Sequence, residues 1–130
     1  MKLKSVLKLV LAGVSLAAAA SAVAAPSRAY DAGAFKEAQS AGKSVLVEIH
    51  ADWCGECRMQ DKVLGKLSAE APYAGLVRLR VDFDGQKDLV KSFGARKEST
   101  LILYKGDREV GRAVGITSEP KIRELLERAI

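Results

Sequence analysis

The stretch Glu48–Gln60, EIHADWCGECRMQ, contains both cysteines of the chain, Cys54 and Cys57, with two residues between them. It begins inside SVLVEIH (44–50), a β-rich and almost wholly apolar run that predicts a strand covered on both faces, with Glu48 as the exception. A helix should follow, because apolar side chains recur at helical spacing: Met59, Val63, Leu64 and Leu67. The two thiols therefore lie where a buried strand gives way to a helix.

This position favours redox chemistry at the cysteine pair. The unpaired N–H groups and the positive end of a helix stabilise a thiolate, so Cys54 should be the nucleophile. Cys57 lies one turn further on and should be the more covered, resolving thiol. A bridge between them closes a small loop, which removes little entropy from the unfolded chain, so a structural staple explains the pair poorly. Structural zinc needs four ligands, and beyond residue 24 the chain offers the two thiols and His50.

The rest of the chain predicts a compact α/β domain. Helices are expected over DAGAFKEAQSAG (31–42), from Cys54 onwards, over QKDLVKSF (86–93) and after Ser118; strands are expected over 44–50, LVRLRVDF (76–83) and the two halves of TLILYKGDREVGRAVG (100–115). A turn at Gly106-Asp107 makes those halves a hairpin. The order α-β-α-β-α-β-β-α indicates a central mixed sheet flanked by helices. Four basic side chains are expected on a solvated face: Arg78, Arg96, Lys97 and Lys105.

The first 24 residues have the layout of a secretory signal peptide. Lysines at positions 2, 4 and 8 precede a short, alanine-rich apolar run, and Ala22-Val23-Ala24 fits the small-x-small cleavage rule. A retained membrane anchor would need about 20 strongly apolar residues. We expect cleavage between Ala24 and Ala25, a periplasmic or secreted protein, and a single domain over residues 25–130.

Charge and composition exclude several classes of function. Three of the 21 basic residues leave with the signal and no acidic ones do, so 18 basic against 16 acidic residues lower the formal charge from +5 to +2. With no basic run of five or more residues, we expect no nucleic-acid partner. The sequence contains no Gly-rich phosphate-binding loop, so we expect no organic cofactor. No feature of the sequence indicates an oligomer, and we expect a monomer.

The motif WCGEC at a strand-to-helix junction, inside this order of elements, resembles thioredoxin over essentially all of residues 25–130. It is most similar to the exported thioredoxin-like thiol-disulfide oxidoreductases, where a signal and ADWC occur together. The resemblance implies the thioredoxin fold and electron exchange with protein disulfides. It implies that Cys54 attacks, that Cys57 resolves, that Trp53 shields the disulfide at the substrate side, and that Gly55 supports the motif.

The resemblance also gives roles to two charged residues on neighbouring strands. Glu48 falls where thioredoxins keep a buried Asp beneath the resolving thiol, and Arg80 falls where they keep a Lys. Glu48 is therefore a candidate third catalytic residue, which takes the proton of Cys57 during exchange. The alternative is a buried carboxylate that is simply paired with Arg80, and both can be true.

The loop FGARKEST (93–100) departs from the family pattern F/Y-G-x-x-x-x-P-T, because Ser99 stands in the position of the cis-proline before Thr100. A cis bond to a residue other than proline costs about 3 kcal/mol, so Glu98-Ser99 is expected to be trans, or cis only if its surroundings impose it. In the family this loop holds substrate peptides, which makes Ser99 and Thr100 candidate substrate-binding residues. The proline also discourages metal capture, so a metal or iron–sulfur module on the same two thiolates is the alternative function.

Glu56, where many thioredoxins have proline, favours one direction of electron flow. A surface carboxylate two residues from Cys54 disfavours its thiolate by about 1 kcal/mol. A less stable thiolate means a less oxidising disulfide. Together with the lack of a helical insertion between Cys57 and Ser99, this predicts a reductase rather than an oxidase. Outside the cytoplasm such a reductase needs a partner, and we expect a membrane-embedded thiol donor.

Overall fold

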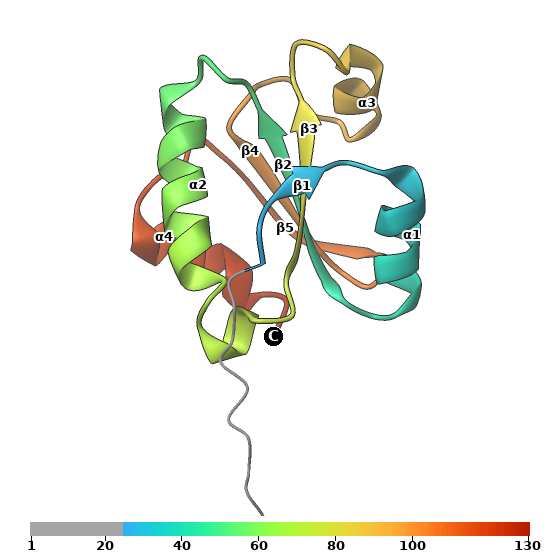
Figure 1. Cartoon of the computed structure of the whole chain (residues 1–130), viewed down its shortest axis with the longest axis vertical. Helices are drawn as coiled ribbons and strands as arrows, with labels where there is room; N and C mark the ends of the chain where they lie inside the picture. The colour runs from blue at the N-terminus through green and yellow to red at the C-terminus, as the bar shows by residue number, and fades with distance from the viewer. Residues whose placement is uncertain (1–24) are drawn as a thin grey trace, which may run out of the picture.

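The computed structural model describes residues 25–130, so the expected signal peptide and its cleavage site lie outside the described residues. The elements run in the order β1 (Arg28–Ala29), α1 (Ala32–Ser40), β2 (Ser44–His50), α2 (Gly55–Leu67), a 3-10 turn η1 (Ala71–Tyr73), β3 (Val77–Asp82), α3 (Lys87–Ser92), β4 (Thr100–Lys105), β5 (Arg108–Val114) and α4 (Glu119–Glu127). They form one sheet with helices on both faces (Figure 1). The predicted α/β fold with a mixed sheet is confirmed.

The sheet has the strand order β1-β3-β2-β4-β5. Strands β1, β3 and β2 are parallel, whereas β4 and β5 run antiparallel to β2 and to each other. The predicted hairpin is present, with Gly106 in its turn at a φ of 58°. Strand β1 was not predicted, since two residues carry no periodic pattern. Among the described helices, none is long and apolar enough to cross a membrane.

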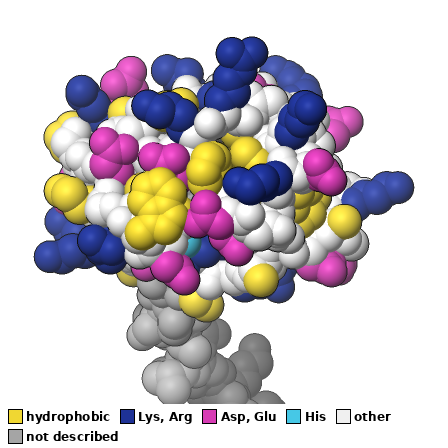
Figure 2. Space-filling model, turned by 90° about the horizontal axis from the view of Figure 1, so that it is seen from above, with side chains coloured by type: hydrophobic (Ala, Val, Ile, Leu, Met, Phe, Trp, Pro, Cys, Tyr) yellow, Lys and Arg dark blue, Asp and Glu magenta, His cyan; other side chains and the backbone are white. Residues whose placement is uncertain are grey.

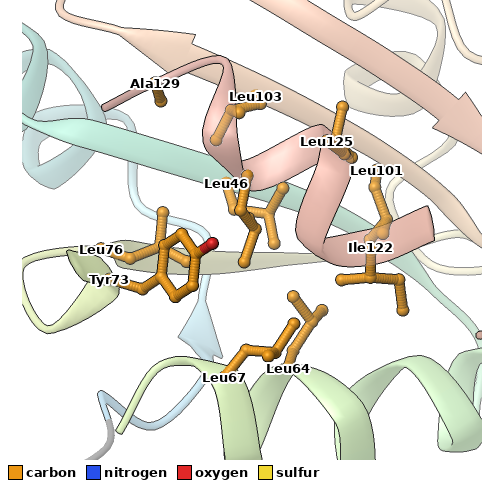
Figure 3. Close-up of a cluster of buried hydrophobic side chains, with 11 residues drawn as sticks. Leu46, Leu64, Leu67, Tyr73, Leu76, Leu101, Leu103, Ile122, Leu125 and Ala129 are labelled. Carbon is orange, nitrogen blue, oxygen red and sulfur yellow. The ribbon is translucent and has the colours of Figure 1, made fainter. Parts of the chain in front are cut away.

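Helix α2 covers one face of the sheet together with α4, and their contact with the central strands is the larger part of the core. Figure 3 shows the side chains that meet there, from Leu46 on β2, Leu101 and Leu103 on β4, Leu64 and Leu67 on α2, and Ile122 and Leu125 on α4. On the opposite face, β-strand side chains such as Val47 and Ile49 pack toward α1 and α3. Strand β2 is therefore buried on both sides, as its apolar run predicts.

The inward face of α2 differs from the predicted one at a single position. Met59 is 56% exposed, whereas Gln60 is 3% exposed and lies in line with Cys57, Leu64 and Leu67. Residues three and four apart share a helix face, and Met59 falls outside that series. A buried glutamine is tolerated because its amide donates to two backbone carbonyls, those of Ser99 (3.0 Å) and Ile116 (2.9 Å).

Helix ends follow the predicted signals with one exception. The Asp31 side chain accepts a hydrogen bond from Ala34 N (2.7 Å) and caps α1, and Gly42 ends this helix region at a φ of 68°. Ser118 occupies the N-cap position of α4, but its side chain makes no capping hydrogen bond. Helix α4 is held instead by its buried face, which places Ile122 and Leu126 in the core.

Candidate active site

The two cysteines form a disulfide at the N-terminus of α2, just beyond the carboxyl end of β2 (Figure 1). Cys54 is the N-cap residue, and its Sγ accepts a hydrogen bond from Cys57 N at 3.1 Å. The Cα atoms are 5.3 Å apart, within the normal range for a bridged pair. Gly55 opens the helix, and a Cβ there would meet only the Arg58 side chain at 3.9 Å, so no steric constraint requires a glycine.

Both sulfur-bearing residues are covered in this oxidised state. Cys54 is 4% exposed and Cys57 is 3% exposed, so the expected difference in cover is slight. The pair packs against Ala51, with the ring of Phe83 alongside. The Cys57 Sγ lies 3.9 Å from the carbonyl oxygen of Ile49 on β2. An attacking thiolate must therefore reach the pair from the end of the molecule that carries α2's first turn.

Trp53 lies at the surface at that end. Trp53 is 60% exposed, and its indole N–H donates to Asp84 Oδ2 at 2.7 Å. Asp84 belongs to the loop between β3 and α3, so the indole is tied to a neighbouring loop. Figure 2 looks onto this end and shows apolar side chains near its centre, with acidic side chains beside them and basic ones more numerous toward the edge.

Glu48 is buried, at 5% exposed, and it is bound by Arg78 rather than by Arg80. Arg78 donates from Nη2 to Glu48 Oε1 (2.8 Å) and from Nε to Oε2 (3.2 Å). The Ser27 hydroxyl donates a third hydrogen bond to Oε2 at 2.7 Å. The expected pair of Glu48 with Arg80 is wrong, although Arg80 is the residue opposite Glu48 in the β2–β3 register.

Arg78 also contradicts the prediction of a solvated face, because its side chain is only 3% exposed. The other three basic residues of that prediction are exposed, as expected: Arg96, Lys97 and Lys105. The difference arises from strand alternation, which turns the side chains at positions 78 and 80 toward the face that α2 covers. On that face the carboxylate of Asp61 in α2 accepts from Arg78 (2.7 Å) and from Arg80 (2.9 Å).

The four side chains form a charge cluster, defined as Glu48, Asp61, Arg78 and Arg80, with two charges of each sign. Burial lowers the pKa of Arg78, but the hydrogen bonds and charges of Glu48 and Asp61 outweigh it and raise this pKa above its ordinary value. Arg78 is therefore a permanent cation beside Glu48. The Nε of Arg80 is buried and has no hydrogen-bond partner among the described residues.

The loop before β4 lies against the first turn of α2. The described residues contain no cis peptide bond, so Glu98-Ser99 is trans, and Ser99 has a φ of 56°. Its hydroxyl donates to Glu56 Oε2 at 2.8 Å, which joins the loop to the residue between the two cysteines. Ser99 is 2% exposed and Thr100 is 1% exposed, and the Thr100 hydroxyl donates to Lys97 O at 2.7 Å. Direct contact of these two residues with a substrate stays a prediction.

Sequence reasoning missed several polar residues that the fold brings to this site: Ser27, Gln60, Asp61, Arg78 and Asp84. One signal was available for Arg78, since two arginines alternate with apolar residues in VRLRV and must share a face. Asp61 lies four residues after Cys57, on a neighbouring turn of α2. The described residues hold no group of three or more His, Cys, Asp or Glu side chains placed to bind a metal ion.

Comparison with known proteins agrees with this geometry. The family model described as Thioredoxin matches residues 28–128. The thioredoxin of Chlamydia muridarum is 38% identical over 84 residues, which cover 65% of this chain and 80% of that protein. The thioredoxin of Alicyclobacillus acidocaldarius is 34% identical over 92 residues, covering 71% of this chain and 87% of the relative.

Solved structures give the same result. The crystal structure of Trxlp from Edwardsiella tarda aligns with a TM-score of 0.74 at 38% identity, covering 77% of this chain and 97% of that one. A mutant thioredoxin from Halobacterium salinarum aligns with a TM-score of 0.68 at 26% identity, covering 83% and 92% of the two chains. The family model, the relatives and the bridged C-x-x-C pair agree with one another. The chain therefore belongs to the thioredoxin family and is a thiol-disulfide oxidoreductase that works through Cys54 and Cys57.

Proposed function

We propose that this protein is an exported disulfide reductase that receives its electrons from a membrane-embedded thiol donor. The observation that carries the direction is the carboxylate of Glu56, which lies in the first turn of α2 between the two cysteines. A carboxylate there competes with the Cys54 thiolate for the positive end of the helix. The reduced form is thereby less stable and the disulfide less oxidising. The signal-like first 24 residues support export.

In the proposed cycle, the Cys54 thiolate attacks one sulfur of a substrate disulfide. The substrate S–S bond breaks, a mixed disulfide with Cys54 forms, and the other substrate sulfur leaves as a thiolate. Cys57 then loses its proton and attacks the Cys54 sulfur, which releases the second substrate thiolate and restores the Cys54–Cys57 bond. Two electrons pass to the substrate, and the donor returns them in the reverse exchange.

Glu48 is the proposed acceptor of the Cys57 proton in the second step. It lies on β2, next to Ile49, whose carbonyl approaches the Cys57 sulfur. Arg78 and Ser27 hold the Glu48 carboxylate in place on the face of the sheet that α2 covers. Trp53 covers the substrate side and is held at Asp84.

The reduction potential of the Cys54–Cys57 pair tests the direction. Metal-free protein is equilibrated in dithiol redox buffers and its free thiols are trapped and counted. We expect a value near that of reducing thioredoxins, about −270 mV, and a value near about −120 mV would contradict a reductase. Glu56→Gln should raise the potential by about 20 mV, because about 1 kcal/mol of thiolate destabilisation is removed. Asp107→Asn, in the distant β4–β5 turn, is the control and should leave the potential unchanged.

Export has its own test. The full chain is expressed in a bacterial host, and the periplasmic fraction is examined for a product whose N-terminal residue is Ala25. Retention of the uncleaved chain in the cytoplasm would contradict export without affecting the redox proposal. Metal analysis of the same material tests the alternative function, which requires stoichiometric metal or an iron–sulfur absorption band.

A further inference from the structure

The carboxylate of Glu56 is held by a hydrogen bond at one oxygen, while the residue itself is exposed to solvent. Ser99 Oγ donates to Glu56 Oε2 at 2.8 Å, and Ser99 itself is only 2% exposed. Glu56, by contrast, is exposed. It lies between Cys54 and Cys57 in the first turn of α2, so the negative charge is held at the end of the helix that carries the disulfide. A surface glutamate ordinarily samples many rotamers, and this one is restrained by a buried donor.

The donor is itself held in place. The carbonyl oxygen of Ser99 accepts from Gln60 Nε2 (3.0 Å) and from the backbone N–H of Gly115 (3.0 Å). These two contacts come from α2 and from the chain after β5, so the serine is tied to two elements. The Ser99 backbone is therefore held by the fold, and its hydroxyl donates to Glu56 from that position.

Gly115 has no side chain, and this makes room for the carboxylate of Glu56. A Cβ at this position would come within 3.3 Å of Glu56 Oε2, and the φ of 72° favours glycine independently. A larger residue would press on the carboxylate. The glycine, the serine and the glutamate thus form one arrangement that sets the direction of the Glu56 side chain.

The same carboxylate lacks a cationic partner. Within the described residues, no Lys, Arg or His nitrogen lies within 4.0 Å of it, and its hydrogen bond to Ser99 uses only Oε2. Arg58, on the same turn of α2, donates to the Asp52 carbonyl oxygen (3.0 Å) instead. Oε1 is available to a donor that arrives from solution.

We propose that Glu56 is a specificity-determining residue, oriented by Ser99, that favours substrate disulfides with a positively charged side chain next to the reacting cysteine. A lysine or arginine beside the substrate cysteine pairs with Oε1 as the sulfur approaches Cys54, whereas a glutamate there is repelled. In this proposal Ser99 acts through Glu56 and is a positioning residue. This inference rests on disulfide exchange at Cys54–Cys57, and it holds for either direction of net electron flow.

The test compares three symmetric peptide disulfides that differ only in the residue after the cysteine: lysine, glutamine or glutamate. Second-order rate constants are measured with the reduced protein and the peptide disulfides, and in reverse with the oxidised protein and the single-thiol peptides. The wild type should react about fivefold faster with the lysine peptide than with the glutamate peptide at low salt, as surface charge pairs allow. The ratio cancels any change that a variant makes in the intrinsic reactivity of Cys54.

Glu56→Gln retains an oxygen that can accept from Ser99 but has no charge, so its lysine-to-glutamate ratio should fall to near one. Ser99→Ala and Glu56→Asp keep the charge and remove the hydrogen bond, the second because its side chain is shorter. Both should give ratios between those of the wild type and Glu56→Gln. The two variants alter different residues, so a local disturbance in one of them does not decide the result.

Asp52→Asn is the matched control. Its carboxylate is also exposed and also two residues from Cys54, but Ser99 does not hold it. The control should keep the wild-type ratio. An equal loss in Asp52→Asn and Glu56→Gln would overturn the proposal in favour of general acidity, and an unchanged ratio in Glu56→Gln would overturn it outright. A full wild-type ratio in both Ser99→Ala and Glu56→Asp would remove Ser99 from the proposal.

Discussion

Arg78 binds Glu48 through two hydrogen bonds of 2.8 and 3.2 Å, although Arg80 is the residue opposite Glu48 in the sheet. The neighbour of Glu48 across the sheet and its ion-pair partner are thus two different arginines. The long side chain of Arg78 reaches diagonally across the face of the sheet that α2 covers. Its guanidinium makes a bidentate contact that satisfies both carboxylate oxygens of Glu48. The buried Glu48 carboxylate is therefore neutralised by Arg78, whereas the resemblance to thioredoxins pointed to Arg80.

Arg78→Met should destabilise the fold strongly, because it leaves the Glu48 carboxylate buried without a cation. Removal of one partner of a buried pair costs about 3–5 kcal/mol. Arg80→Met should cost about 1 kcal/mol or less, since the Arg80 side chain is 30% exposed and bonds only to the half-exposed Asp61. Equilibrium unfolding in urea measures both. Equal losses would show that Arg78 has no special role.

Glu48→Gln should slow the second step of exchange and spare the first. The amide cannot accept the Cys57 proton, and a lost general base costs about 100-fold. Acid quenching during reaction with a peptide disulfide should then reveal accumulated mixed disulfide on Cys54. The control is Glu48→Gln in a Cys57→Ser background, where no second step exists and the rate of the first step should equal that of Cys57→Ser alone. Unchanged resolution would leave Glu48 as a purely structural partner of Arg78.

Ser99→Gly should be more stable than Ser99→Ala by about 1 kcal/mol. Both variants lose the hydrogen bond to Glu56, but only alanine retains a Cβ at the φ of 56°. The two free energies of unfolding, measured side by side, isolate the backbone contribution. An alanine variant as stable as the glycine variant would mean that this conformation costs nothing here.

Arg123→Gln should lower stability at pH 7 and have little effect near pH 3. Arg123 donates to Glu70 and Glu119. Its hydrogen bonds to Glu70 lower the pKa of that carboxyl below its ordinary 4.5, and hydrogen bonds from Lys66 and Arg123 lower the pKa of Glu119. A lowered pKa in the folded state stabilises the protein above the unfolded pKa and loses this effect as pH falls through the folded one. Urea midpoints at pH 7 and pH 3 measure the change. The control, Arg108→Gln on β5, should shift both midpoints alike.

Periodicity accounts for what the sequence could predict. The apolar run of β2, the helical spacing of Leu64 and Leu67, and the glycine in the hairpin turn are local signals, and each was confirmed. The position of the cysteine pair at a helix N-terminus followed from those elements. Strand β1 had no such signal, because its two residues are extended only through pairing with β3.

The polar contacts of the site were beyond local reasoning. Gln60 is polar and would ordinarily face solvent, yet its acceptors lie 39 and 56 residues further along the chain. Arginine is usually found at the protein surface, and Arg78 is buried only because Glu48 and Asp61 approach it from β2 and α2. Contacts of this range depend on register and helix docking, which no short stretch of sequence encodes.

Trp53 gives the molecule a built-in optical reporter. It is the single tryptophan of the chain, it is 60% exposed, and it directly precedes Cys54. A disulfide quenches the fluorescence of a nearby indole, so emission should rise when the bridge is reduced and fall when it re-forms. Electron transfer in this protein can therefore be followed in real time without any added label.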